Sequence, residues 1–581
     1  MRLLFLFVIL FPFAVRAQYA GQRTYCNPMD IGYRYNFEQL NEQISYRSGA
    51  DPVIVNHKGE YFLFVTISGG WWHSKDLVNW NYVVPDKWPM EDMCAPAAMS
   101  VHDTLYLFQS TFDKRPIFYT TTPENGKLHF YNRWLPQLPK DVGPWDPALF
   151  YDEELDKWYM YWGSSNVYPL YGSELDKSKR LKYKGDYKGL IYLHPEEHGW
   201  ERFGPDHTSG IKPFTEGAWM TKHNGKYYLQ YGAPGTEYNV YANGTYVGDH
   251  PLGPFTYAPY NPVSYKPGGF VTGAGHGNTF QDNYGNYWNT GTPWVAVNWN
   301  FERRIAMFPA GFDRDGQMFA NTRFGDLPHY LPTRKWESKD ELFTGWMLLS
   351  YRKPATASSE RDTFNVARIT DENPRTFWVA KENREGEWIT IDLQKESQVN
   401  ALQVNYTDYK SDIYDGTDPK IYTQFRIYHS RDGKQWEKIV DLTGEKRDRP
   451  NAYLELKKPV TTRYIKYEHV YVASPNLAIS DIRVFGTAPG KAPATPSKFT
   501  VRRDTDPRNA FVDWQKVPGA TGYNILWGIA PDKLYQTYQT WADAPTTKEI
   551  RALSKGVSYY FVIEAFNESG VSKTTPVVFV K

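Results

Sequence analysis

The sequence predicts an all-β protein whose N-terminal half is a β-propeller with five blades. Aromatic residues make up 17% of the 581 residues, and aromatic side chains suit the pleated, half-buried faces of strands. A short polar signal precedes an aromatic hairpin five times in the first 300 residues, at intervals of 44 to 70 residues. Each interval has room for one four-stranded sheet, and such a period is typical of propellers.

The five repeats share one layout, in which a signal is followed by an apolar strand, a polar turn and a second strand rich in Tyr, Trp and Phe. In four of them the signal is Asp51, Asp146, Glu216 or His276. If the signals occupy equivalent positions at the start of each innermost strand, these side chains converge on one polar centre. The repeats read GADPVIVNHKGEYFLFVT from Gly49, CAPAAMSVHDTLYLFQST from Cys94, GPWDPALFYDEELDKWYMYWGSS from Gly143, TEGAWMTKHNGKYYLQYGAP from Thr215 and GAGHGNTFQDNYGNYWNTGTPW from Gly273.

Two further β-modules follow the propeller, which we expect to span residues 18–336. Residues 345–486 contain short strands with alternating apolar residues, as in WITIDL, and this pattern is typical of an antiparallel sandwich. Residues 487–498 are rich in Pro, Ala and Gly and are predicted to be a linker. Residues 499–581 form another series of short strands with aromatic residues at spacings common in small β-sandwiches.

Residues 1–17 are predicted to be a secretory signal peptide. They contain an early Arg, an apolar run from Leu3 to Val15 and a small-residue cleavage site. A membrane anchor is the alternative, but the run is shorter than the ~20 residues that a spanning helix needs. We therefore expect a secreted or periplasmic protein. Only Cys26 and Cys94 follow this segment, which excludes a disulfide framework and leaves open one bridge or two buried thiols.

The balance of charge excludes two classes of partner. The chain has 66 basic and 65 acidic residues, a net charge of +1. Such a chain has no broad field to attract nucleic acid or an anionic membrane surface. We therefore expect no nucleic acid, no membrane insertion and a monomer.

Several motifs, in this order and spacing, resemble known modules. The N-terminal region is similar to the catalytic domain of glycoside hydrolase family 43, a five-bladed propeller. The middle region resembles discoidin-like (coagulation factor 5/8 type C) jelly rolls through TFWVA, WITIDL, SRDGKQWEK and AISDIRVFG, and the last region resembles a fibronectin type III domain. The motifs of the first resemblance are ADP at 50–52, HSKDLVNW at 73–80, WDPALFYD at 145–152, EGAW at 216–219, GAGHG at 273–277 and RRIAMFPAGFDRDG at 303–316.

Glycoside hydrolysis needs two carboxyl groups, one to protonate the leaving oxygen and one to activate water or to attack the sugar. The resemblance implies that Asp51 is the general base, Glu216 the general acid, and Asp146 the residue that orients the acid and modulates its pKa. It also implies inversion of the anomeric centre, for which the carboxyls stand roughly 6.5–9.5 Å apart with water between them. The alternative for each residue alone is turn chemistry, since Asp-Pro and Glu-Gly pairs are common in turns.

Aromatic and basic residues near these carboxylates are candidate substrate-binding groups. Trp72, Trp145 and Trp219 could stack on the C–H faces of a sugar, although packing between blades is the alternative. The resemblance implies an Arg on a substrate hydroxyl, and Arg303 and Arg304 precede the strand IAMFPAGF. Their alternative is a surface charge at a strand end.

The resemblance also implies that His276 lies beside the substrate or beside a central, water-coordinated calcium. With one candidate His and no dense Asp/Asn cluster, zinc is not supported. A structural calcium is compatible with the sequence but cannot be read from it. We expect no cofactor to be required.

The sequence therefore predicts a secreted, inverting glycosidase. It would cleave a terminal sugar such as arabinofuranose, xylose or galactose from a polysaccharide or its oligosaccharides. The alternative is a non-catalytic carbohydrate-binding or adhesion protein on a propeller scaffold, against which the presence of Asp51, Asp146 and Glu216 argues. One departure is Cys94-Ala95-Pro96, where many proteins that the chain resembles carry Trp-Ala-Pro, so one aromatic wall is missing.

Overall fold

The structure, a computed structural model, describes residues 23–36, 45–87, 94–110, 117–132 and 145–581. The predicted signal peptide lies outside the described residues. Among them the helical elements are short 3₁₀ turns and everything else regular is strand, so the all-β prediction is confirmed. No described helix is long and apolar enough to cross a membrane. The turns are η2 (Pro123–Asn125), η4 (Lys177–Lys179), η5 (Gly199–Glu201), η6 (Pro205–His207) and η7 (Val366–Thr370).

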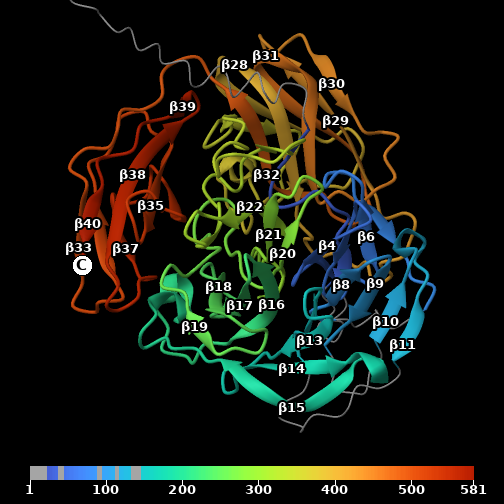
Figure 1. The fold of residues 1–581 in the computed structure, drawn as a ribbon. Coiled ribbons are helices and arrows are strands. Elements are labelled where there is room, and N and C mark those ends of the chain that lie inside the picture. The colour runs from blue at the N-terminus through green and yellow to red at the C-terminus, as the bar shows by residue number, and fades with distance from the viewer. Residues whose placement is uncertain (1–22, 37–44, 88–93, 111–116, 133–144) are drawn as a thin grey trace, which may run out of the picture.

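Five four-stranded antiparallel sheets, here called blades 1 to 5, follow one another along the chain, and each is built in sequence order (Figure 1). Each starts at one of the five sequence repeats. Blade 1 is β4 (Val53–His57), β5 (Glu60–Phe64), β6 (Trp71–Ser74) and β7 (Asn81–Val83). Blade 2 is β8 (Ala97–Val101), β9 (Thr104–Phe108), β10 (Ile117–Thr120) and β11 (His129–Asn132). Blade 3 is β12 (Ala148–Asp152), β13 (Lys157–Trp162), β14 (Leu170–Asp176) and β15 (Lys182–Ile191). Blade 4 is β16 (Glu216–His223), β17 (Lys226–Ala233), β18 (Ala242–Gly248) and β19 (Phe255–Tyr257), and blade 5 is β20 (Thr279–Gln281), β21 (Tyr287–Gly291), β22 (Ala306–Phe312) and β23 (Met318–Ala320).

The first strands of the blades form the inside of a ring. β4 lies against β8, β8 against β12, β12 against β16, and β20 returns to β4. Blades 4 and 5 are joined by the indole of Trp219, which donates to the carbonyl of Thr279 at 3.0 Å. Outside the ring, β1 (Thr24–Tyr25) pairs with β24 (His329–Tyr330) and ties the start of the described chain to the segment after blade 5.

The second module is an eight-stranded antiparallel sheet around an apolar core of its own. The alternation predicted in WITIDL is present, because Ile389, Ile391 and Leu393 are all buried in the core of the module. Its strands are β25 (Met347–Leu348), β26 (Ala355–Ala357), β27 (Trp378–Val379), β28 (Trp388–Tyr406), β29 (Thr423–Ser430), β30 (Glu437–Asp441), β31 (Asn451–Val472) and β32 (Ala478–Thr487).

The third module consists of two sheets. One contains β33 (Thr500–Arg503), β34 (Ala510–Asp513) and β37 (Thr547–Ile550); the other contains β35 (Gly522–Gly528), β36 (Gln536–Trp541), β38 (Tyr559–Asn567), β39 (Gly570–Val571) and β40 (Val578–Val580). The fibronectin type III identity of this sandwich stays a prediction. The predicted linker lies along the module, since Ala488 N donates to Glu568 O and Thr495 Oγ1 to Lys573 O.

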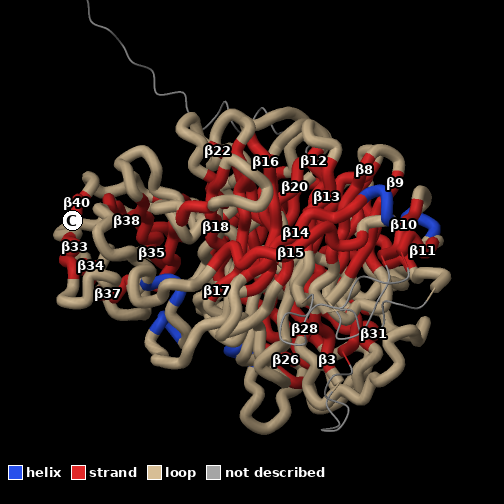
Figure 2. Tube along the Cα trace, turned by 60° about the horizontal axis from the view of Figure 1, so that its bottom comes forward, coloured by secondary structure: helices blue, strands red, loops and turns tan. Residues whose placement is uncertain are grey.

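Both modules pack directly against the propeller (Figures 1 and 2). Glu564 of the third module accepts two hydrogen bonds from Arg323 at 2.6 and 2.7 Å. In the second module, Asp408 forms a buried ion pair with Arg47 at 2.7 Å. Arg47 lies on β3 (Tyr46–Ser48), which pairs with β2 (Arg34–Asn36).

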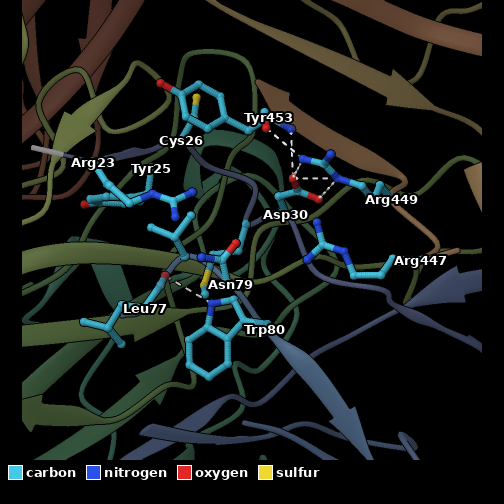
Figure 3. A pocket seen from close by; sticks show the side chains of 12 residues that line it. Arg23, Tyr25, Cys26, Asp30, Leu77, Asn79, Trp80, Arg447, Arg449 and Tyr453 are labelled. Carbon is cyan, nitrogen blue, oxygen red and sulfur yellow. Dashed lines mark hydrogen bonds and ion pairs between the residues drawn. The ribbon is translucent and has the colours of Figure 1, made fainter. Parts of the chain in front are cut away.

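A small pocket marks the seam between the second module and the start of the propeller (Figure 3). Arg449 points across it to Asp30, while the indole of Trp80 donates to Leu77 O. Cys26, which also lines it, is a free, buried thiol that donates to Asp326 O at 3.1 Å. Among the described residues, Cys26 and Cys94 form no disulfide bridge with each other.

Candidate active site

The chain enters the first strand of every blade in the same way. Just before that strand, a backbone carbonyl is bound by the N–H of the residue at the end of the second strand. These pairs are Ala50 with Thr66, Cys94 with Ser110, Trp145 with Gly163, and Gly275 with Thr292, at 2.7–3.0 Å. In blade 4 the equivalent pair is Glu216 and Gly232, which face each other in register.

The residue that follows has a left-handed backbone in all five blades. These residues are Asp51, Ala95, Asp146, Gly217 and His276, with φ between 42° and 62°. A positive φ is uncommon outside Gly, with Asn, Asp and His enriched among the exceptions, and it clusters at functional sites. Glu216 is therefore not equivalent to Asp51, contrary to the interpretation of the repeat. It stands one residue earlier, where β16 has a register shift between Glu216 and Trp219.

Three of these left-handed residues donate their backbone N–H to a Ser or Thr hydroxyl of the preceding blade. Asp51 N donates to Thr292 Oγ1 at 2.9 Å, Ala95 N to Thr66 Oγ1 at 2.8 Å, and Asp146 N to Ser110 Oγ at 2.8 Å. In blade 4 the donor is Gly217 N, and the side chain of Asp146 accepts its hydrogen bond. The sequence interpretation missed these hydroxyls, although a Ser or Thr just past the second strand recurs in three of the five repeats, as Thr66, Ser110 and Thr292.

The imidazole of His276 joins the carboxylates of two blades. Its Nδ1 lies 3.1 Å from Asp51 Oδ1 and 3.8 Å from Asp146 Oδ2. Thr66 Oγ1 donates to the other oxygen of Asp51 at 2.5 Å. One ligand atom each of Asp146, Glu216 and His276 lie within 4.8 Å of one another. The structure thus brings together all four residues that the repeat singled out.

Burial makes this cluster compete for protons. Burial raises the pKa of Asp146 to about 7. The carboxylates of Glu216 and Asp51 add to this shift, and His276 opposes it. Burial alone would lower the pKa of His276, but the pKa is raised because Asp51, Asp146 and Glu216 surround the ring. The surrounding carboxylates therefore favour the protonated form of His276, and Asp146 titrates near neutral pH.

Glu216 has a hydroxyl partner for each carboxyl oxygen. The phenol of Tyr241 donates to Oε1 in a short hydrogen bond, and Ser164 Oγ donates to Oε2 at 3.0 Å. Burial, with the nearby Glu216 carboxylate adding to it, raises the pKa of Tyr241, so the phenol keeps its proton. Our sequence reading missed both partners, and no spacing pattern distinguishes Tyr241 from the other tyrosines of its loop.

Residues 43–317 match the model of the family described as Glycosyl hydrolases family 43. The chain carries a family 43 domain. Residues 354–477 match the F5/8 type C domain. Both of these resemblances proposed from the sequence are thereby confirmed.

Three individual proteins that are similar to this chain share between 16% and 28% sequence identity with it. A protein of Escherichia coli (strain K12) named "Putative beta-xylosidase" is 28% identical over 212 residues, which is 33% of this chain and 35% of that protein. The match thus spans about a third of that protein's length. A solved structure titled as a thermostable family-43 glycoside hydrolase is 21% identical with a TM-score of 0.41, covering 54% of this chain and 98% of its own. The GH43 BlXynB protein from Bacillus licheniformis is 16% identical with a TM-score of 0.41, covering 79% and 100%.

The structure leaves two of the predicted substrate-binding residues, Trp145 and Arg303, as candidates. Trp145 is half-buried directly before Asp146. Arg303 places Nη1 3.8 Å from Asp51 Oδ1. Both remain candidates for contact with a substrate.

Three other predicted binding residues are structural, which corrects the sequence interpretation. Trp72 is 1% exposed and lies on the third strand of blade 1 in a core with Trp80. Trp219 is buried between blades 4 and 5, where its indole is bound to Thr279. Arg304 is 2% exposed and donates to Arg47 O and to Asn451 of the F5/8 type C domain. Proximity in sequence to a catalytic candidate did not show which way these side chains point.

The loops after each second strand form the rim of the site in the family 43 domain. First and second strands are antiparallel, so these loops open at the same end as the left-handed residues. One such loop, which follows β17, carries Glu237. Burial, together with Glu216, raises the pKa of Glu237, while Arg303 lowers it. Its carboxyl group thus lies in the electrostatic field of the same site.

The donors fit a structural calcium poorly. Asp146, Glu216 and His276 offer two carboxylates and one nitrogen, whereas calcium takes six to eight oxygen ligands. The same three groups also compete for protons. Calcium near His276 therefore stays a sequence prediction, and no chemical step below depends on it.

Proposed function

We propose that this chain is an inverting glycosidase that releases a terminal sugar from a polysaccharide or its oligosaccharides. Asp51 acts as general base, Glu216 as general acid, and Asp146 orients the acid and tunes its proton. The observation that carries this proposal is the convergence of these three carboxyl groups around His276 at one end of the propeller axis. Glycoside hydrolysis requires two carboxyl groups in different environments, because one must donate a proton and the other must accept one or attack the sugar.

Asp51 is built to act on water. Thr66 and His276 bind its two oxygens, and Arg303 lies 3.8 Å away, so the carboxylate is held in one orientation. Its left-handed backbone is held by Thr292 of blade 5. A fixed carboxylate can accept the proton of a water that attacks the anomeric carbon.

Glu216 is built to deliver a proton. A hydroxyl can donate or accept a hydrogen bond, so Tyr241 and Ser164 can bind both the protonated and the ionised carboxyl. Asp146 lies within the same cluster and itself titrates near neutral pH. The Glu216 carboxylate adds to the rise in the pKa of Asp146, because two adjacent carboxylates repel each other.

The identity of the sugar is supported less directly. The E. coli protein named as a beta-xylosidase supports a pentoside, and arabinofuranosides and galactosides remain in the proposal. We also propose that residues 1–17 direct export, so that the enzyme works outside the cytoplasm on extracellular or periplasmic glycans.

The test is a panel of aryl glycosides, comprising α-L-arabinofuranoside, β-D-xyloside and β-D-galactoside, with wild type, Asp51→Asn and Glu216→Gln. Asp51→Asn should lose roughly 10²- to 10⁴-fold in activity on every substrate that wild type cleaves. Glu216→Gln should lose most on poor leaving groups and little on dinitrophenyl glycosides, which need no protonation. If neither substitution lowers activity, the roles are wrong. If wild type binds glycans but cleaves none, the adhesion function replaces the enzyme.

A further inference from the structure

The F5/8 type C domain covers one rim loop of the family 43 domain. This loop, residues 292–305, runs from Thr292, which holds Asp51, to Arg303, which faces Asp51. Val297 in its middle packs into an apolar cluster formed by Phe377, Val379 and Ala478 of the second module. The second module therefore supports a loop that contributes to the candidate active site.

Arg375 of the second module reaches Trp294 on this loop. It lies between η7 and β27, and its guanidinium carbon is 4.4 Å from the centre of the Trp294 ring. Arg375 is exposed, and within the described parts of the chain its guanidinium makes no hydrogen bond or ion pair. Its five N–H donors are thus held over an aromatic ring without an acceptor.

Trp294 is connected to the catalytic candidates through its own loop. It is two residues beyond Thr292, and its backbone forms a bridge with Arg303. The ring of Tyr238, next to Glu237 on the neighbouring rim loop, has its centre 6.3 Å from that of Trp294. A chain of contacts therefore links Asp51 through Arg303 and Trp294 to Arg375.

We propose that Trp294 and Arg375 form a subsite for the sugar on the leaving-group side, shared between the two domains. The proposal rests on the function proposed above, in which a terminal sugar occupies the axis and the rest of the glycan extends over the rim. Aromatic rings contact the apolar faces of sugars. The free N–H donors of Arg375 bind sugar oxygens. The planar guanidinium group presents its donors in a fork that suits a pair of acceptor oxygens.

The alternative role for Arg375 is adhesion between the two domains. A purely adhesive contact would affect stability and all substrates alike, because loosening the loop would also displace Arg303. A subsite would affect only those substrates that have a sugar beyond the cleaved bond. The two roles therefore predict different ratios of activity between long and short substrates.

The experiment compares Arg375→Ala and Arg375→Lys with wild type on two substrates, the aryl glycoside that wild type cleaves best and the trisaccharide of the same sugar. Arg375→Ala should lower kcat/KM for the trisaccharide roughly 10- to 100-fold, the effect of one hydrogen bond to a charged group, mainly through KM. The aryl glycoside should change less than about 2-fold, since its leaving group has no hydroxyl acceptor. Arg375→Lys should recover part of the loss.

The matched control is Arg502→Ala. Arg502 is an exposed arginine that stacks over Phe511 at 4.8 Å in the third module, and its removal should leave both substrates unchanged. An equal change on both substrates with Arg375→Ala, or no change, overturns the subsite. If wild type cleaves no glycoside, the proposed function is wrong, but the subsite can still be tested. Binding of xylotriose, arabinotriose and galactotriose to wild type and to Arg375→Ala is then compared. Affinities that are equal in wild type and Arg375→Ala, or no binding at all, overturn the subsite.

Discussion

His276 Nδ1 lies 3.1 Å from Asp51 Oδ1, although the two residues belong to blades 5 and 1 and are far apart in the sequence. Both occupy the same left-handed position of their repeats. The surrounding carboxylates raise the pKa of the imidazole and so favour a positive charge next to the proposed base.

Replacing His276 by Asn removes this charge and keeps an N–H donor, and Asn tolerates the left-handed backbone. We expect kcat/KM to fall roughly 10²-fold, as when one preorganised electrostatic group is lost. Steady-state kinetics and a melting curve check this. His223→Asn is the control, since His223 stacks on Phe312 at the far end of β16 and should leave activity unchanged. Full activity in His276→Asn would show that the imidazole has no part in the reaction.

Gly217 should not tolerate a side chain. A Cβ there would lie 2.6 Å from Cδ2 of His276, whereas a Cβ at Gly225 would meet nothing within 4 Å. Both residues have positive φ, so both Ala variants should lose about 1–2 kcal/mol of unfolding free energy from backbone strain. Only Gly217→Ala should also lose activity. Equal activities of the two variants would contradict the close contact between blades 4 and 5.

The stability of the wild type should fall relative to that of Asp146→Asn as pH rises. The folded state raises the pKa of Asp146 from 3.8 to about 7, so the protonated form favours folding. That contribution is full below about pH 3.8 and is lost as pH rises through about 7, by up to a few kcal/mol. His276, with a raised pKa, acts in the same direction above about pH 6.5. Melting temperatures at pH 5 to 8 check this; a difference independent of pH would show that Asp146 does not titrate in the folded protein.

Tyr241→Phe should affect the acid and not the base. Removing the phenol leaves Glu216 without one of its two hydroxyl partners. We expect roughly a 10-fold loss of kcat on poor leaving groups, the scale of one hydrogen bond to a charged group, and little loss on dinitrophenyl glycosides. Tyr246→Phe, on the strand β18 that directly follows Tyr241, is the control, because Tyr246 donates to Tyr192 O away from the site. An equal loss for all leaving groups would place Tyr241 outside the acid's environment.

The sequence predicted the position of a site residue where one sequence repeat corresponds to one blade of the structure. Asp51, Asp146 and His276 could be placed together because the same turn precedes the same strand in three blades. Glu216 was assigned to the wrong position, since a pattern of composition does not reveal the register shift in β16. It was nevertheless placed in the right cluster, because it is adjacent to the equivalent residue, Gly217.

The rest depends on tertiary structure. Trp219 lies three residues after Glu216, and Trp72 lies on the third strand of blade 1, but both side chains are buried in the core. Tyr241 reaches Glu216 from a loop with no repeated pattern. The contact between Arg375 and Trp294 depends on how two domains dock, which no local pattern contains.

The anomeric configuration of the first product tests the central claim most directly. Proton NMR during the first turnovers, on the substrate selected by the aryl glycoside panel, resolves the anomer before mutarotation. A water activated by Asp51 on the face opposite Glu216 predicts a released sugar of inverted configuration. A product of retained configuration would require a covalent glycosyl intermediate and would contradict the roles assigned to Asp51 and Glu216.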